Sequence, residues 1–113
     1  MKILSNVVSI EELEQLKEIM EDEFDMLISL FVEDSEKLIG DIKNAYDAKD
    51  NEALRIASHT LKGSSSNMCA GALADLSKQI EDKARENDSS DLDTLIEQIS
   101  STHGEVIKIL QNF

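Results

Sequence analysis

The residues best suited to chemistry in this 113-residue chain are His59 and Lys62, one helical turn apart and followed directly by Gly63. The segment around them, from about Asn51 to Asn67, is otherwise typical of a helix. A glycine inside a helix costs roughly 1 kcal/mol relative to alanine, so Gly63 indicates that a partner comes close at this point. A neutral imidazole nitrogen is nucleophilic near neutral pH. The pattern therefore predicts chemistry at His59.

The expected orientation of His59 follows from the apolar residues of the same helix. They recur at spacings of three, four and seven residues and predict its buried face: Leu54, Ala57, Leu61 and Met68. At about 100° per residue, His59 lies about 200° from Ala57 and from Leu61, on the outward side. The residues expected to share this outward face are Arg55, Lys62, Gly63 and, two turns on, Ser66.

Transient phosphorylation of the imidazole is the chemistry that suits such a face. A phosphoryl group adds roughly two negative charges, which Lys62 and Arg55 would partly offset. The chain has no glycine-rich phosphate loop for a nucleotide, so the phosphoryl group is expected to come from one protein and leave to another. A metal site is not expected, because no carboxylate stands three or four residues after His59. The other histidine, His103, is predicted to be a surface or end-of-bundle residue without a functional role.

The composition narrows the class of protein. A net charge of −13 argues against binding to nucleic acid or to an anionic membrane, because the field of the chain repels phosphate. The single cysteine, Cys69, allows no intrachain disulfide and fits a reducing cytoplasm. The N-terminus is too short and too quickly acidic for a signal peptide. No run approaches the roughly 18 apolar residues of a membrane span, so a cytoplasmic protein is expected.

The chain contains no proline, and its apolar periodicity predicts five helices. Their expected ranges are Ile10 to Met20, Glu23 to Ala48, Asn51 to Asn67, Ala72 to Glu86, and a last helix that opens at Ser90. The expected caps are a Ser9–Glu12 capping box, Asp50, and Ser90 with Asp93. The second helix is predicted to bury one stripe, made of Phe24, Met26, Leu27, Leu30, Phe31, Leu38, Ile42 and Tyr46.

These elements predict an all-α fold, an antiparallel up-and-down four-helix bundle with an additional short N-terminal helix. One domain is expected over residues 1–113, with an N-terminal segment and short helix over 1–21 and the bundle over 22–113.

The run from His59 to Asn67, His-Thr-Leu-Lys-Gly-Ser-Ser-Ser-Asn, resembles the signature of histidine-containing phosphotransfer (HPt) domains, the intermediate carriers of multistep phosphorelays. The resemblance extends from about Phe24 to Glu86, through Phe31-Val32-Glu33-Asp34 upstream and Leu73, Leu76 and Ile80-Glu81 downstream. It implies an antiparallel four-helix bundle that exposes the phosphorylated histidine. The implied partners are aspartate-bearing receiver domains and a sensor or hybrid histidine kinase.

By position, the resemblance makes His59 the phosphoryl acceptor and donor, Lys62 the adjacent cation and Gly63 the clearance residue. Ser66 falls where a neighbour of the imidazole would lie, and the expected docking residues are Arg55, Ile56 and Thr60. We expect a monomeric carrier without kinase activity of its own, with no cofactor and with magnesium on the receiver domain. The family commonly has glycine ten residues after the histidine, where this chain has Cys69.

Three other interpretations remain open at this point. A sensor-kinase dimerisation and phosphoacceptor domain usually has an acidic residue after the histidine and a nearby proline, whereas this chain has Thr60 and no proline. An acyl carrier protein is suggested by the Asp88-Ser89-Ser90 turn, but the Asp-Ser-Leu attachment sequence is absent. A helical adaptor could bind receiver domains without any chemistry at His59.

Overall fold

The computed structural model describes residues 7–113, and this part of the chain contains helices and no strand, which confirms the all-α prediction. Residues 1–6, on which the signal-peptide argument rests in part, lie outside the described residues. The helices are α1 (Ile10–Met20), α2 (Phe24–Asp47), α3 (Asn51–Asn67), α4 (Gly71–Arg85) and α5 (Leu92–Gln111), with a short 3-10 turn, η2 (Glu21–Glu23), between α1 and α2. None of these helices is long and apolar enough to span a bilayer.

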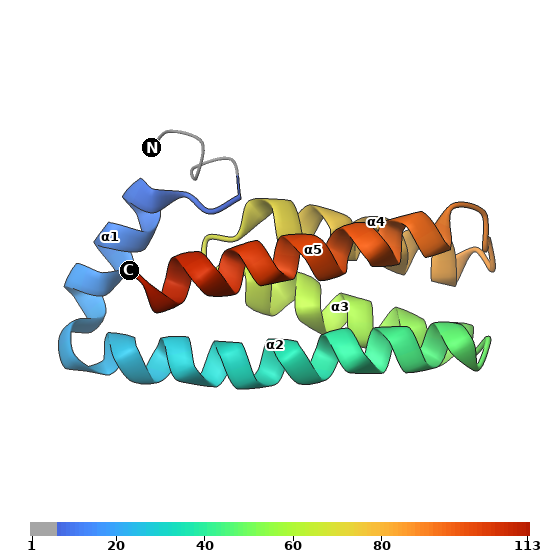
Figure 1. Ribbon diagram of the computed structural model, residues 1–113, viewed down its shortest axis with the longest axis horizontal. Coiled ribbons are helices and arrows are strands. Elements are labelled where there is room, and N and C mark those ends of the chain that lie inside the picture. The colour runs from blue at the N-terminus through green and yellow to red at the C-terminus, as the bar shows by residue number, and fades with distance from the viewer. Residues whose placement is uncertain (1–6) are drawn as a thin grey trace.

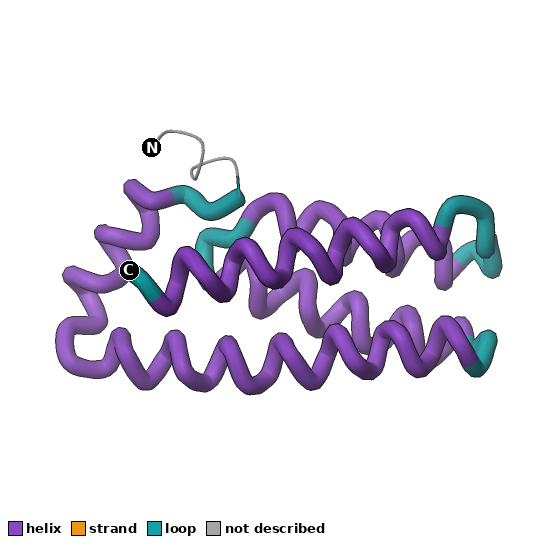
Figure 2. Tube along the Cα trace, in the orientation of Figure 1, coloured by secondary structure: helices purple, strands orange, loops and turns teal. Residues whose placement is uncertain are grey.

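The four longer helices lie side by side, and each runs opposite to the one before it (Figure 1). Short loops join them at the two ends of the bundle (Figure 2). α3 packs against both α2 and α4, and α5 closes the bundle against α4 and α2. α1 lies across one end, beside the C-terminus (Figure 1).

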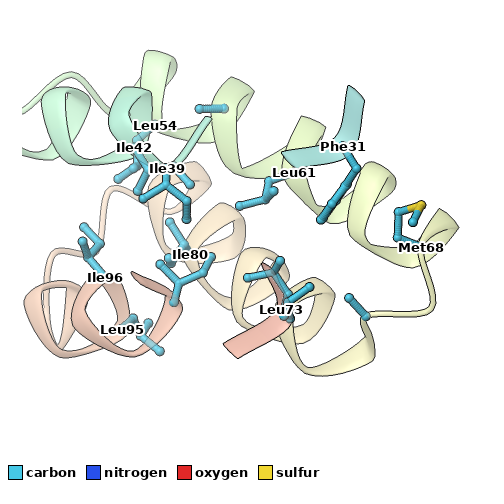
Figure 3. Packing of buried hydrophobic residues seen from close by; sticks show 14 of the residues in the cluster. Phe31, Ile39, Ile42, Leu54, Leu61, Met68, Leu73, Ile80, Leu95 and Ile96 are labelled. Atoms are coloured by element: carbon cyan, nitrogen blue, oxygen red, sulfur yellow. The ribbon is translucent and has the colours of Figure 1, made fainter. Parts of the chain in front are cut away.

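The predicted buried face of α3 is confirmed, because Leu54, Ala57, Leu61 and Met68 are all buried. They meet side chains of the neighbouring helices in one core, part of which is drawn in Figure 3; its labelled members include Phe31, Ile39, Ile42, Leu73, Ile80, Leu95 and Ile96. The stripe predicted for α2 was too wide. Met26 and Leu30 are 65% and 50% exposed. Met26, for example, lies about 200° around the helix from the buried Phe24 and so faces away from the core.

The predicted caps at Ser9 and Asp50 are confirmed, but only half of the capping box forms, because the backbone N–H of Ser9 donates to the Cys69 carbonyl and not to the Glu12 side chain. The backbone N–H of Glu12 donates to Ser9 Oγ at 3.3 Å, and that of Ala53 donates to Asp50 Oδ1 at 3.1 Å. The third predicted cap was wrong, since α5 begins after Asp91, which has a φ of 61° and no side-chain cap.

Ser90 instead stabilises the turn before α5 by donating to Asp88. Its backbone N–H and hydroxyl lie 3.0 and 2.6 Å from Asp88 Oδ1. The hydroxyl and backbone hydrogen bonds from Ser90, together with the nearby Lys83 ammonium, lower the pKa of Asp88 to about 2. Asp88 is therefore the residue that organises this turn.

His103 is buried, contrary to the prediction of a surface or end-of-bundle position. Only 8% of the residue is exposed, and a 2.8 Å hydrogen bond joins its Nε2 to Ser35 Oγ on α2. Its spacing explains the burial, because His103 follows Ile99 by four residues and precedes Val106 by three, on the buried stripe of α5. Burial lowers the pKa of His103 below its usual range.

Cys69 occupies the turn between α3 and α4 with a left-handed backbone, at a φ of 63°. Glycine adopts that conformation at least cost, which accounts for the glycine usual at this place in the family that the sequence resembles. The Cys69 carbonyl accepts a 2.9 Å hydrogen bond from the backbone N–H of Ser9. Partial burial raises the pKa of the thiol. The turn thus ties the segment before α1 to the end of α3.

Candidate functional site

His59 lies near the middle of α3, with its imidazole pointing out of the bundle. Its side chain is 60% exposed, whereas Leu61 two residues later is fully buried. Gly63 is also exposed, and a Cβ placed on it would meet nothing within 4 Å. The histidine therefore stands beside open space along its own helix.

The nearest polar partner of the imidazole is Glu81, on the neighbouring helix α4. Glu81 Oε2 lies 2.8 Å from His59 Nδ1, although the glutamate is only 1% exposed. Two cations share the same carboxylate: Lys62 Nζ is 2.9 Å from Oε1, and Arg85 Nη2 is 2.7 Å from Oε2. Glu81 thus joins His59 to one cation on α3 and one on α4.

The protonation of this pair can be deduced from its contacts. Burial alone would raise the pKa of Glu81, but the Lys62 ammonium and the hydrogen bond with His59 outweigh burial and lower it to about 2. The carboxylate is therefore ionised at neutral pH and can only accept hydrogen bonds. Nδ1 of His59 must then carry the proton, which leaves the lone pair of the neutral imidazole on Nε2.

A small buried serine stands close in sequence to each member of the His59–Glu81 pair: Ser58 directly precedes His59, and Ser77 lies one turn before Glu81. Ser58 on α3 and Ser77 on α4 are both fully buried. Each hydroxyl donates to a backbone carbonyl of its own helix, Ser58 to Leu54 at 2.7 Å and Ser77 to Leu73 at 2.8 Å. Both hydroxyls are thus satisfied within their own helices, so neither needs a polar partner from a neighbouring helix.

Two of the predicted neighbours of His59 have other partners. Arg55 forms a forked contact with Glu52 on its own helix, at 2.7 and 3.3 Å. Ser66 lines a small pocket at the α3–α4 turn together with Val8 and Cys69. Within residues 7–113, neither of them makes a hydrogen bond to the imidazole.

Glu81 was not predicted as a partner of His59, because residue spacing indicates only which side chains of the same helix lie together. The structure places that partner 22 residues later, on the next helix. Arg85 was missed for the same reason, since its link to the site passes through Glu81. One local signal was present, because a glutamate and an arginine four residues apart form a common pair on a helix surface.

A shallow groove runs beside the site between α2 and α3. We call it the α2–α3 groove; its lining includes Leu38, Asp41, Ala53, Ile56, Ala57 and Thr60. Ile56 is 51% exposed although it is large and apolar. Two of the three predicted docking residues, Ile56 and Thr60, therefore line one groove, and Arg55 lies next to Ile56 along the helix.

The side chains that ligate metals are dispersed. No group of three or more His, Cys, Asp or Glu residues in the described part of the chain is arranged to hold a metal ion. The polar groups around His59 are one carboxylate and two cations, a set that suits an anion arriving beside the imidazole.

Comparisons with known proteins agree with this geometry. Residues 26–109 match the model of the Hpt domain family. The structure is similar to the crystal structure of histidine-containing phosphotransfer protein B (HptB) from Pseudomonas aeruginosa PAO1, with a TM-score of 0.89 and 36% sequence identity over 93% of this chain and 91% of that chain. No curated protein sequence matches the chain. The chain belongs to the Hpt domain family, and its role is that of a histidine phosphotransfer carrier in a phosphorelay.

Proposed function

We propose that His59 is the residue that carries the phosphoryl group, taking it from an aspartyl phosphate on one receiver domain and passing it to the aspartate of another. A single observation supports this assignment best. The imidazole is largely exposed while its Nδ1 is held by the buried, ionised Glu81. A neutral imidazole fixed in this way presents Nε2 as its nucleophile.

The transfer proceeds in line at phosphorus. The lone pair of Nε2 forms the new bond to phosphorus, and the bond to the aspartyl oxygen breaks, which returns a carboxylate to the receiver. Such a reaction depends mainly on positioning and on charge stabilisation. We assign the magnesium ion to the receiver domain, and this chain supplies the nucleophile and the neighbouring cations.

Lys62 and Gly63 take supporting roles in the proposal. Lys62 lies next to the imidazole and is held by Glu81 in the unphosphorylated protein, from where its flexible ammonium can turn toward the phosphoryl oxygens. Gly63 leaves room for the receiver, because the space beyond its backbone is open. Ser66 remains a proposed neighbour of the imidazole that would act only in the complex, and Ser66→Ala tests it through the transfer rate.

We propose that the receiver docks over the α2–α3 groove. The exposed Ile56 would be its apolar anchor, with Thr60 and Arg55 beside it. Replacing Ile56 by aspartate should weaken binding of a receiver at least tenfold in titration calorimetry, because it puts a charge in an apolar contact. Labelling of the free protein by phosphoramidate should be unaffected, and equal receiver affinity of the two proteins would contradict this docking surface.

The decisive experiment is phosphoryl transfer from a radiolabelled receiver. The wild-type chain should acquire a label that is acid-labile and base-stable, and His59→Gln should acquire none. His103→Gln provides the matched control, because it removes the other histidine, which is buried. Undiminished labelling of His59→Gln would overturn the assignment.

The same experiment separates the alternatives. A helical adaptor would bind the receiver without taking the label. A sensor-kinase phosphoacceptor domain needs an ATP-binding partner domain, so incubation with ATP alone should leave this chain unlabelled. We propose that the carrier has no kinase activity of its own and acts as a monomer in the cytoplasm, where a free thiol such as Cys69 is stable. Light scattering tests the monomer.

A further inference from the structure

The fate of one proton decides how well a phosphohistidine donates. When the phosphoryl group leaves, the bond between phosphorus and Nε2 breaks and the electron pair stays on Nε2. If Nδ1 still carries its proton, the leaving group is neutral imidazole. If Nδ1 has lost it, the leaving group is an imidazolate anion, which leaves far more slowly.

We infer that Glu81 keeps the proton on Nδ1 while His59 is phosphorylated and so extends phosphoryl donation to higher pH. This inference rests on the proposed phosphorylation of His59. Its geometric basis is the 2.8 Å contact between Nδ1 and Oε2, made by a carboxylate that is only 1% exposed. An ionised carboxylate that accepts the Nδ1 hydrogen favours the protonated ring.

Among the charges around the imidazole, Glu81 decides whether Nδ1 keeps its proton. Two cations contact Glu81 directly, Lys62 from α3 and Arg85 from α4. The charged groups around them are paired on their own helices, Arg55 with Glu52 on α3, and Lys78 with Asp82 on α4. A cation near the ring favours loss of its proton. Removing the charge of Glu81 would take away the acceptor of the Nδ1 hydrogen and would leave Lys62 and Arg85 without their shared anion. Both consequences favour loss of the proton from the ring.

The step balances without a proton from solvent. On loading, Nε2 bonds to phosphorus and the receiver regains its carboxylate, while Nδ1 keeps its hydrogen. On unloading, the phosphorus–Nε2 bond breaks and the neutral imidazole returns in the tautomer from which it began. Glu81 never touches the phosphoryl group and acts through His59, which makes it a positioning residue.

Glu81→Gln tests the inference, because glutamine keeps the size and one acceptor oxygen of the side chain but lacks the charge. Asp75→Asn is the matched control: it makes the same change of charge on the exposed surface of α4. His59 is loaded chemically with phosphoramidate, and loss of the phosphoryl group is followed from about pH 5 to about pH 10, a range that spans the usual titration of imidazole. Transfer to one receiver domain is measured over the same range.

The rates of hydrolysis and of transfer should both fall as the pH rises. In Glu81→Gln we expect the midpoint of this fall about one pH unit lower than in the wild type. On the alkaline side of that midpoint, the variant should react about tenfold more slowly than the wild type, because one pH unit corresponds to a tenfold change in the protonated fraction. Asp75→Asn should follow the wild-type curve. Thermal melting by circular dichroism verifies that all three proteins are folded.

Two results would overturn the inference: an unchanged midpoint in Glu81→Gln, or an equal displacement in Asp75→Asn. A purely structural role for Glu81 would slow the reaction at every pH and leave the midpoint where it is. Chemical loading needs no partner protein. A wild-type chain that takes nothing from any receiver would therefore contradict the proposed function, while the hydrolysis profile would still decide the role of Glu81.

Discussion

The ionised Glu81 should make this protein lose stability in acid, over a window that the structure defines. Its pKa is about 2 in the folded chain, against an ordinary value of 4.5. The unfolded chain therefore binds a proton at Glu81 more readily than the folded chain does. Such a group stabilises the fold above about pH 4.5, and its contribution is lost as the pH falls toward about 2.

The size of this contribution follows from the difference between the two pKa values. At about 1.4 kcal/mol per unit, the change from 4.5 to about 2 corresponds to about 3 kcal/mol. Lys62 and Arg85, which hold the carboxylate, are themselves about one third and one half exposed. Solvent weakens ion pairs of that kind, so we expect about 2 to 3 kcal/mol.

The assay compares urea unfolding of the wild type and Glu81→Gln at a series of pH values, followed by circular dichroism. A protonated glutamate and a glutamine have nearly the same shape and neither is charged. The variant should therefore be less stable by about 2 to 3 kcal/mol at neutral pH, and the difference should shrink steadily below about pH 4.5. Asp75→Asn again controls for net charge. A difference that stays constant down to about pH 3 would refute the ion-pair reasoning.

Three further predictions concern other positions. Gly63→Ala should raise the free energy of unfolding by about 1 kcal/mol, since its Cβ meets open space, while Gly63→Leu should slow transfer from a receiver without reducing phosphoramidate labelling. Urea unfolding should find Cys69→Gly more stable and Cys69→Val less stable than the wild type, by about 1 kcal/mol each, because the φ of 63° suits glycine and opposes a β-branched side chain. The wild type should lose stability as the pH falls below about 6.5, because the pKa of the buried His103 is lowered and the unfolded chain therefore takes up the proton first. His103→Leu should remove that part of the pH dependence of the free energy of unfolding. An identical pH dependence in both proteins would contradict this prediction.

Features set by short-range chemistry could be predicted from the sequence. The bounds of α3 and the caps at Ser9 and Asp50 depend on residues within one turn. The outward direction of His59 depends only on its phase relative to Leu54 and Leu61. Each of these follows from the geometry of a single helix.

Features that depend on how two helices pack could not be predicted in this way. The register between α3 and α4 decides that Glu81, rather than another acidic residue of α4, meets His59. The pairing of α2 with α5 places Ser35 opposite His103, and nothing near either residue in the sequence indicates that contact. Met26 and Leu30 illustrate the converse error, because apolar type alone did not say which flank of α2 faces solvent.

The packing of α3 against α4 also explains how a chain of net charge −13 can hold a phosphoryl group. Acidic residues are concentrated in α1, η2 and the first turn of α2, at one end of the bundle (Figure 1): Glu11, Glu12, Glu14, Glu18, Glu21, Asp22, Glu23 and Asp25. The acidic region begins next to the turn at Cys69, because the backbone N–H of Ser9 donates to the Cys69 carbonyl. Cys69 lies ten residues beyond His59.

Most of that interval is helical, since α3 continues to Asn67. At about 1.5 Å per residue, the near edge of the acidic region lies about 15 Å from the imidazole along the helix. Exposed charges are largely screened beyond about 8 Å at physiological ionic strength. The acidic end therefore contributes little to the field at His59. The charges nearest to the phosphoryl group are Glu81 and the two cations that share it, Lys62 and Arg85, and the charges around them are paired, Arg55 with Glu52 and Lys78 with Asp82. Local neutralisation across the α3–α4 interface, and not the net charge of the chain, determines the electrostatics of the site.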